Sequence, residues 1–226
     1  MTQPGIEETG MSAAGTRSTQ RRTTRMRPSK EPTNEAEVPL TVVLVRHGQP
    51  DLTKRDGEMG PPLTLLGRRQ ASSVAERLAA QTFDHIYSSD LVRARETAEY
   101  IRRFHQPTPF TVTPHAREVT THHFLSGAVP EAAGVRSAVR RERKVLRQFV
   151  SQLHADHPYG ERLLIICHAN FIRTVIPMLG GKSARRSVLL DVCHASVTSV
   201  DVWPSGVAVL RSANSVSHLL PSQVSG

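Results

Sequence analysis

The chain has 226 residues, a formal net charge of +9 and only 4% aromatic residues. This length suffices for one α/β domain of roughly 150–200 residues and a tail, with a core that needs no disulfide or structural metal. No run of 18 apolar residues is present, so we expect no membrane-spanning helix. The positive charge admits a polyanionic partner, but scattered arginines without an RNA-binding aromatic pattern argue against nucleic acid.

Residues 1–39 read as a disordered polar and basic tail, because they are rich in Thr, Ser, Pro and Gly and lack apolar periodicity. Residues 16–30 carry six basic groups and no acidic one, which also fits a transit peptide or a nucleic-acid-binding arm. Glu7, Glu8 and the absence of an amphipathic face argue against a transit peptide. With only two cysteines, both in or beside apolar runs, we expect a cytoplasmic protein, with a mitochondrial location as the alternative.

From residue 40 onward, short apolar runs alternate with segments of helical periodicity. We expect Thr64 to cap the first helix and Asp90 the second, and Val145 to lie on the inner face of the third. The sequence predicts strands at residues 41–45, 85–89, 111–114 and 163–167, helices at 64–81, 90–101, 135–153 and 170–179, and a C-terminal hairpin of 196–203 and 206–211.

This alternation predicts an α/β fold with a mostly parallel central sheet and helices on both of its faces. We expect residues 40–213 to form the domain and residues 214–226 to form a C-terminal tail. The stretch 119–134 is expected to be a loop.

Two histidines follow the two most apolar strands: His47 after residues 42–46, and His168 after residues 163–167. Neighbouring parallel strands would place both imidazoles at one edge of the sheet, where open α/β proteins bind ligands. Arg46 beside His47 suggests phosphate chemistry, because an arginine fork clamps phosphate oxygens and a neutral imidazole is a good nucleophile toward phosphorus.

The cysteines indicate packing rather than chemistry. Cys167 alternates with His168 along its strand, so its thiol should point into the core. The pairs Cys167-His168 and Cys193-His194 raise zinc binding as an alternative, but no Cys-x2-Cys spacing exists and adjacent strand residues face opposite ways. We therefore expect no metal and no cofactor.

Four segments in this order resemble the histidine phosphatase superfamily, which has the phosphoglycerate-mutase-like fold. They are residues 46–49, 63–71, 88–98 and 167–170, and the resemblance spans roughly residues 41–212. Arg-His-Gly alone is a weak signal, but four motifs in order at predicted strand ends and helix starts are a strong one. Residues 166–173, with the hairpin and tail after them, look most like the branch that contains the mutase-like mitochondrial Ser/Thr protein phosphatase.

The resemblance implies that His47 is a nucleophile that forms a phosphohistidine. It also implies that Arg46, Arg93 and His168 hold the phosphoryl group, and we add Gln49 to this set. The residue types fit, because fixed cations stabilise the charge on a phosphoryl group in flight.

Family members take a catalytic acid from the segment after the second arginine, and Glu118 fits that position. Val119 follows it, where many relatives in this branch have glycine, and Asp51 is the alternative acid. His122 and His123 lie in the loop that follows, either as solvated loop residues or at the substrate rim.

The sequence thus predicts a metal-independent phosphomonoester hydrolase acting on a phosphorylated small molecule or a phosphoprotein. A phosphoglycerate-type mutase is the alternative, although the stretch 119–134 is short for the insertion that usually encloses a mutase substrate. An alternative of another class is a nucleic-acid-binding protein that uses the Arg-rich tail. We expect no membrane partner, and a homodimer is left open.

Overall fold

Strands and helices alternate along the chain in the order that the periodicity predicts. The computed structural model describes residues 37–54, 57–119, 133–181 and 190–226. The elements are β1 (Leu40–Arg46), α1 (Leu65–Leu78), β2 (His85–Ser89), α2 (Val92–Arg102), β3 (Phe110–Thr113), η1 (Pro114–Ala116), α4 (Ala133–Asp156), β4 (Arg162–Cys167), α5 (Ala169–Leu179), β5 (Val197–Val202), β6 (Ala208–Ser215) and η2 (Pro221–Gln223). No helix in these ranges is long and apolar enough to cross a membrane.

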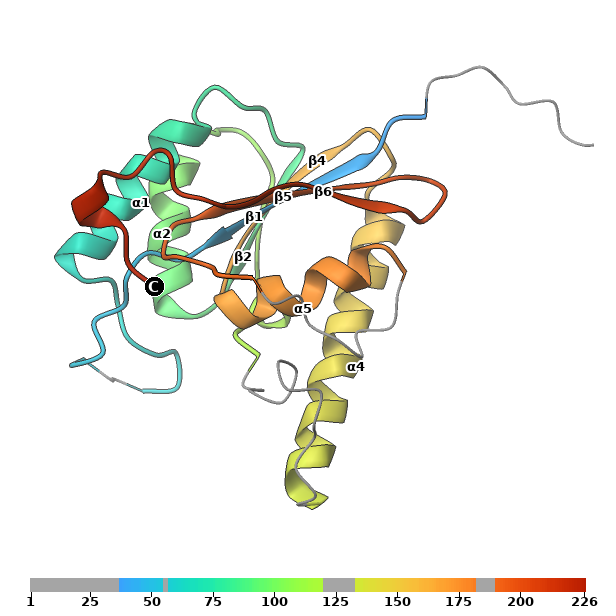
Figure 1. Ribbon diagram of the computed structural model, residues 1–226, viewed down its shortest axis with the longest axis horizontal. Coiled ribbons are helices and arrows are strands. Elements are labelled where there is room, and N and C mark those ends of the chain that lie inside the picture. Colours follow the sequence, from blue (N-terminus) through green and yellow to red (C-terminus); the bar gives the residue numbers. More distant parts are fainter. Residues whose placement is uncertain (1–36, 55–56, 120–132, 182–189) are drawn as a thin grey trace, which may run out of the picture. The chain divides into compact units, whose positions relative to one another are not determined.

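The six strands form one sheet in the order β3-β2-β4-β1-β5-β6 (Figure 1). β1 pairs with β4, β4 with β2 and β2 with β3, all in parallel. β5 runs antiparallel to β1, and β6 antiparallel to β5. The mostly parallel sheet and the C-terminal hairpin are therefore confirmed, with β6 continuing to Ser215.

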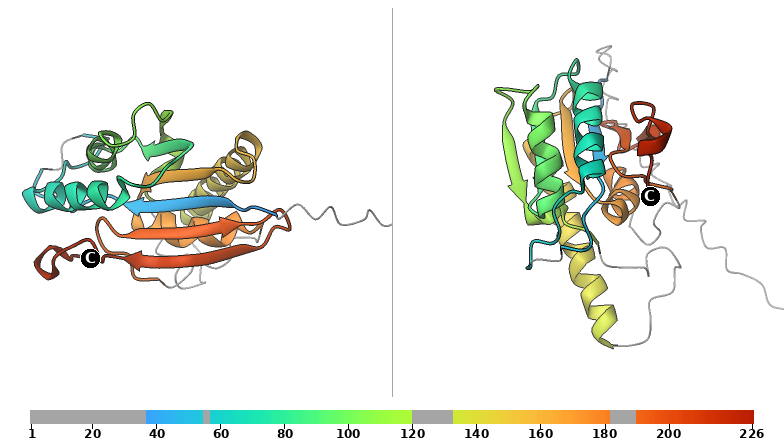
Figure 2. Two further views of the ribbon diagram at one scale, coloured as in Figure 1. Left: turned by 90° about the horizontal axis from the view of Figure 1, so that it is seen from above. Right: turned by 90° about the vertical axis from the view of Figure 1, so that its left-hand side faces the viewer.

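Helices cover both faces of the sheet, as predicted (Figure 2). Because side chains alternate across a strand, Val43 and Val45 of β1 join the apolar cluster under α1 and α2, whereas Val42 and Leu44 join the cluster under α4 and α5. Near-continuous apolar strands are what a sheet buried on both faces requires.

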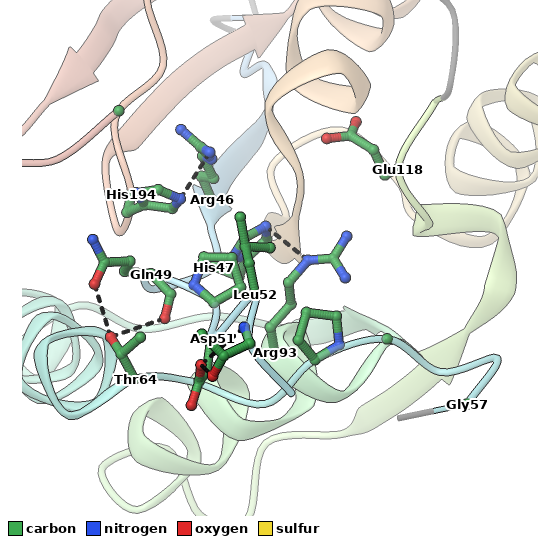
Figure 3. Close-up of a pocket in the computed structure, with 15 residues that line it drawn as sticks. Arg46, His47, Gln49, Asp51, Leu52, Gly57, Thr64, Arg93, Glu118 and His194 are labelled. Carbon is green, nitrogen blue, oxygen red and sulfur yellow. Dashed lines mark hydrogen bonds between the residues drawn. The ribbon is translucent and has the colours of Figure 1, made fainter. Parts of the chain in front are cut away.

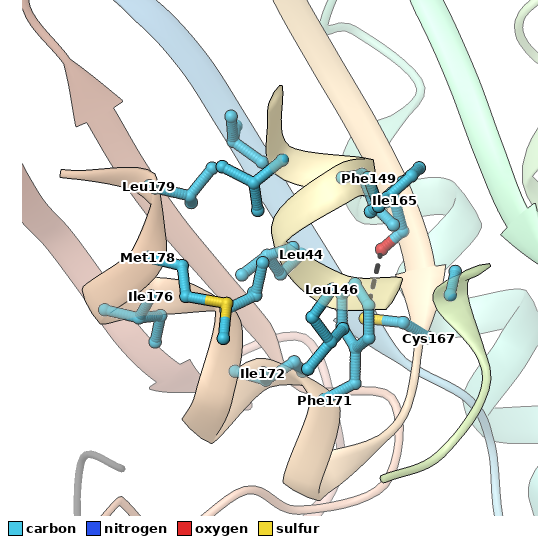
Figure 4. Packing of buried hydrophobic residues seen from close by; sticks show 14 of the residues in the cluster. Leu44, Leu146, Phe149, Ile165, Cys167, Phe171, Ile172, Ile176, Met178 and Leu179 are labelled. Carbon is cyan, nitrogen blue, oxygen red and sulfur yellow. Dashed lines mark hydrogen bonds between the residues drawn. The ribbon is translucent and has the colours of Figure 1, made fainter. Parts of the chain in front are cut away.

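Cys167 faces the core, as the strand alternation predicts. Its completely buried thiol lies in the cluster under α4 and α5 and contacts the carbonyl of Ile165 (Figure 4). Burial raises the pKa of this thiol well above its usual value, so it is a packing group and not a nucleophile.

Two local predictions were wrong and one is confirmed. Thr64 caps α1 by accepting a hydrogen bond from the Gly67 amide. Asp90 does not cap α2, because its carboxylate forms a bidentate ion pair with Arg117, with N–O distances of 2.7 and 2.8 Å. Val145 is 37% exposed, because it lies at the margin of the inward face of α4, which consists of Val139, Leu146, Phe149, Val150 and Leu153.

The ends of several strands lie at one edge of the sheet. The carboxyl ends of β1, β2 and β4 meet there, since these strands are parallel, and the start of β5 joins them, since β5 is antiparallel to β1. This edge positions the candidate site.

Candidate active site

A cavity of about 820 Å³ opens at this edge of the sheet (Figure 3). Its wall combines the residues after β1 with contributions from the loop before α1, from α2 and from the segment before β5. The described lining residues are Arg46, His47, Gln49, Pro50, Asp51, Leu52, Thr53, Gly57, Gly60, Pro61, Thr64, Arg93, Glu118, His194 and Gly226.

His47 is held in a single tautomer. Its Nδ1 lies 2.7 Å from the carbonyl oxygen of Gly48, while Nε of Arg93 donates to its Nε2 at 3.0 Å. A carbonyl only accepts, so Nδ1 carries the proton and Nε2 holds the lone pair. Burial is the main cause that lowers the pKa of His47 well below its usual value, with His168 and Arg93 adding to it. The ring is therefore neutral at pH 7, with Nε2 as its nucleophilic atom.

The backbone after His47 is packed tightly against α1 and α2. A Cβ atom on Gly48 would lie 2.4 Å from the carbonyl oxygen of Gly67, which explains why glycine completes the Arg-His-Gly motif. The amide of Gly48 donates to Oγ1 of Thr97 at 3.1 Å, and the next amide donates to Oε1 of Gln70 at 2.8 Å. Both Thr97 and Gln70 are completely buried, so they fix this turn.

Arg46 and Arg93 bring two positive charges to His47. Arg46 is the last residue of β1, and Arg93 lies in the first turn of α2, where free backbone N–H groups also favour an anion. Burial lowers the pKa of both guanidinium groups, but arginine stays charged at neutral pH. Together they can hold the oxygens of a phosphoryl group.

His168 lies behind His47 as the residue that precedes α5. It is completely buried, and the two ring centroids are 4.9 Å apart. Its Nε2 lies 2.9 Å from Oγ of Ser89, and its buried Nδ1 has no partner in the described part of the chain. Burial, followed by Arg93 and Arg46, lowers the pKa of His168 well below its usual value.

Glu118 lines the cavity on the far side of Arg93 from His47 (Figure 3). Its Oε1 accepts hydrogen bonds from three backbone amides, those of Val119, Asn170 and Phe171. Burial raises the pKa of this carboxyl group, while the three amides and Arg93 oppose the shift. A raised pKa increases the protonated fraction near neutral pH, which a general acid needs.

Gln49 and Asp51 also line the cavity, and a side-chain oxygen of each is held by a neighbouring threonine. Oε1 of Gln49 accepts from Oγ1 of Thr64 at 2.9 Å. Oδ1 of Asp51 accepts from Oγ1 of Thr53 at 2.6 Å, and this bond is the main cause that lowers the pKa of Asp51. A carboxylate that stays ionised is a poor proton donor, so of these two carboxyl groups Glu118 has the pKa shift that suits a general acid.

His194 lines the cavity as well, although its sequence context indicates no role in the site. Its ring centroid lies 5.7 Å from that of His47, and its Nε2 is 2.8 Å from Nη2 of Arg46. The signal that could have found it is the antiparallel pairing of β5 with β1, which places the segment before β5 beside the residues that follow β1.

The remaining candidates fall outside the chemistry or outside the described residues. Arg173 donates to Oδ1 of Asn170 and to the carbonyl of Leu190, so it braces the start of α5. His122 and His123 lie outside the described residues. Within the described ranges, no group of three or more His, Cys, Asp or Glu side chains is arranged to hold a metal ion.

Comparison with known proteins matches residues 42–134 to the histidine phosphatase superfamily (branch 1). The probable phosphoglycerate mutase GpmB of Yersinia pestis (strain Pestoides F) is 29% identical over 205 residues, which cover 80% of this chain and 95% of that protein.

Solved structures show the same fold. The phosphoserine phosphatase of Entamoeba histolytica, in complex with 3-phosphoglyceric acid, matches with a TM-score of 0.64 and 24% identity over 80% of this chain and all of its own. The phosphoglycerate mutase of Bacillus anthracis matches with a TM-score of 0.62 and 22% identity over 80% of this chain and 96% of its own. The match of residues 42–134 and the shared fold agree with the arrangement around His47, and the chain is similar to the histidine phosphatase superfamily; the proteins that it resembles include both a phosphatase and mutases.

Proposed function

We propose that this protein is a metal-independent phosphomonoesterase that forms a phosphohistidine on His47. The observation that carries the proposal is the state of the His47 ring, which is neutral, protonated on Nδ1 and flanked by Arg46 and Arg93. That arrangement provides a nucleophile and fixed cations beside one another in a cavity large enough for a small substrate.

In the first step, Nε2 of His47 attacks phosphorus and the bond from phosphorus to the ester oxygen breaks. The leaving oxygen takes the proton of Glu118, so the alcohol departs neutral. The imidazole now carries a positive charge, which the bond from Nδ1–H to the Gly48 carbonyl stabilises. Arg93 must give up its bond to Nε2 as the phosphoryl group arrives, and its N–H groups pass to the phosphoryl oxygens.

In the second step, water attacks the phosphorus of the phosphohistidine. Ionised Glu118 accepts the proton of the water, the bond from phosphorus to Nε2 breaks, and phosphate leaves with the ring neutral again. The unpartnered Nδ1 of His168 supports this scheme, because a buried polar atom beside His47 needs the partner that a phosphoryl oxygen would supply.

A mutase that returns the phosphoryl group to its substrate is the second candidate, favoured by the likeness to the probable mutase GpmB. Such an enzyme must also hold the carboxylate of a phosphoglycerate. Among the described lining residues, the only arginines or lysines are Arg46 and Arg93, both committed to the phosphoryl group, which favours hydrolysis. Nucleic-acid binding depends on residues 1–39, of which 1–36 lie outside the described residues.

The deciding experiment supplies the purified protein with 3-phosphoglycerate and measures both 2-phosphoglycerate and free phosphate. A phosphatase screen of sugar phosphates, nucleotides and phosphopeptides is run in parallel to identify the substrate class. Phosphate release from at least one class, without isomerisation, is expected. Isomerisation that outpaces phosphate release would assign the protein to the mutases.

A further inference from the structure

Arg46 is oriented by neutral acceptors. Its Nη1 donates to the carbonyl oxygen of Val192, and its Nη2 donates to Nε2 of His194 at 2.8 Å. Among the described ion pairs, none includes Arg46, whereas Arg117 is paired with both oxygens of Asp90. Neutral partners fix a guanidinium without forming an ion pair with it, so Arg46 can still attract an anion in addition to its electrostatic interaction with Glu118. Its buried Nε has no partner in the described part of the chain.

The contact with Arg46 determines the tautomer of His194. A guanidinium only donates, so Nε2 of His194 must accept, and its proton lies on Nδ1. That nitrogen lies 3.0 Å from Oγ of Ser225, to which it donates. The backbone amide of His194 donates to the carbonyl of Ser225 at 2.8 Å, so His194 is bonded to Ser225 through both its ring and its backbone.

Gln70 ties this segment to the nucleophile. Its Nε2 donates to Oγ of Ser225 at 2.9 Å and to the carbonyl of Gln223, while its Oε1 accepts from the amide of Gln49. Gln70 is completely buried, so these contacts are shielded from water. One side chain of α1 thus connects the turn after His47 to the group that holds His194.

We propose that His194 is a positioning residue that, with residues 219–225, holds the Arg46 guanidinium in the orientation in which its free N–H groups meet the substrate phosphoryl group. This role presupposes the phosphohistidine chemistry proposed above. His194 acts through Arg46 and need not touch the reacting atoms, and the C-terminal segment is part of the site.

The test compares His194→Leu, which removes both the acceptor and the donor, with His194→Gln, whose amide can supply both. Activity toward p-nitrophenyl phosphate and inhibition by inorganic phosphate are measured for each. A hydrogen bond to a charged group is worth about 1.5–3 kcal/mol, so His194→Leu should lose about 10–100-fold in kcat/KM and bind phosphate correspondingly more weakly. His194→Gln should recover most of that loss. His105→Leu, at a buried histidine outside the cavity, is the matched control and should keep wild-type kinetics.

A double-mutant cycle separates positioning from a general structural role. If His194 acts through Arg46, adding His194→Leu to Arg46→Ala should cost almost nothing further in phosphate affinity. Independent, additive losses would overturn the proposal, as would wild-type phosphate affinity in His194→Leu. Ser225→Ala, at a half-buried position, is the milder variant should His194→Leu fail to fold. It removes the acceptor of both His194 Nδ1 and Gln70 Nε2, and a loss of about 2–10-fold is expected from these neutral hydrogen bonds. Unchanged kinetics and phosphate affinity in Ser225→Ala would contradict the proposal that the C-terminal segment helps to hold His194.

Isothermal titration calorimetry with inorganic phosphate separates the test of the positioning role from the test of phosphohistidine catalysis. Binding requires no turnover, so it reports on Arg46 even if the protein hydrolyses nothing. Retained hydrolysis in His47→Ala would overturn the phosphohistidine mechanism alone. Retained phosphate binding in His194→Leu would overturn the positioning role alone.

Discussion

Nε of Arg93 donates a hydrogen bond to Nε2 of His47 at 3.0 Å, so the free enzyme keeps its nucleophilic nitrogen occupied by the same cation that is proposed to hold the phosphoryl group. Because Nδ1 of His47 donates to the Gly48 carbonyl, Nε2 is the ring nitrogen of His47 that carries the lone pair, and Arg93 donates to that lone pair. A substrate must therefore displace Arg93 from His47 before attack, and the phosphoryl oxygens are the acceptors that can do so.

Replacing His47 with alanine should abolish phosphate release, because it removes Nε2, the atom that is proposed to attack phosphorus. Wild-type protein quenched with base during turnover should carry acid-labile phosphate on His47, detectable by mass spectrometry. The melting temperature of His47→Ala should show that the fold survives. Near-wild-type activity in this variant would contradict the phosphohistidine mechanism.

Activity should survive EDTA, because the charges that stabilise transfer come from Arg46 and Arg93 and the described residues contain no ligand set for a cation. Vanadate, which mimics pentacoordinate phosphorus, should inhibit. Initial rates before and after dialysis against chelator provide the measurement. A strict requirement for Mg²⁺ or Zn²⁺ would contradict the assignment.

Glu118→Gln should affect poor leaving groups most. An alkyl phosphate leaves as a basic alkoxide and needs a proton, whereas p-nitrophenolate needs it far less. General acid catalysis typically supplies about 10²–10⁴-fold, so hydrolysis of an alkyl phosphate should slow by about that factor and hydrolysis of p-nitrophenyl phosphate much less.

Arg93→Ala is the matched comparison for Glu118→Gln. It should slow both substrates alike, because holding the phosphoryl group does not depend on the leaving group. Equal losses on the two substrates in Glu118→Gln would remove Glu118 as the acid. Asp51→Asn should then be tested in the same assay.

Gly48→Ala should destabilise the protein, because its Cβ would lie 2.4 Å from the backbone carbonyl of Gly67. Forcing apart such packed elements typically costs about 1–3 kcal/mol, and His47 should shift with the turn, so kcat/KM should also fall. Gly134→Ala in α4, where a Cβ meets open space, is the control and should leave the free energy of unfolding unchanged or slightly higher. Urea denaturation of both variants measures the difference, and equal stability would contradict the packing argument.

The free energy of unfolding should fall as the pH falls from 6.5 toward 4, in part through His194. Burial, followed by Arg46, lowers the pKa of His194 from 6.5 to about 4. Between these values the unfolded chain binds more protons than the folded one, so acid favours unfolding, by up to about 1.4 kcal/mol per pH unit from this group. His194→Gln removes that titration. Urea midpoints at pH 7.5 and 5.0 should therefore differ less in the variant, and an equal or larger difference would refute the prediction.

The sequence by itself determined the parts of this protein that local patterns encode. Short, near-continuous apolar runs and segments with a helical period predicted the alternating elements and the mostly parallel sheet, and the alternation of side chains along a strand predicted the burial of Cys167. The strand ends then placed His47 and His168 at one edge, because neighbouring parallel strands end on the same side.

Tertiary structure decided what depends on residues far apart in the chain. Asp90 precedes a helix and looks like a cap, yet the guanidinium of Arg117, 27 residues later, offers its carboxylate two charge-assisted hydrogen bonds. His194 reaches Arg46 only because β5 pairs antiparallel with β1, and Ser225 reaches His194 only because the C-terminal segment packs against Gln70. Such contacts leave no periodic trace in the sequence, because a hydrogen bond between distant residues requires only that folding bring one donor to one acceptor.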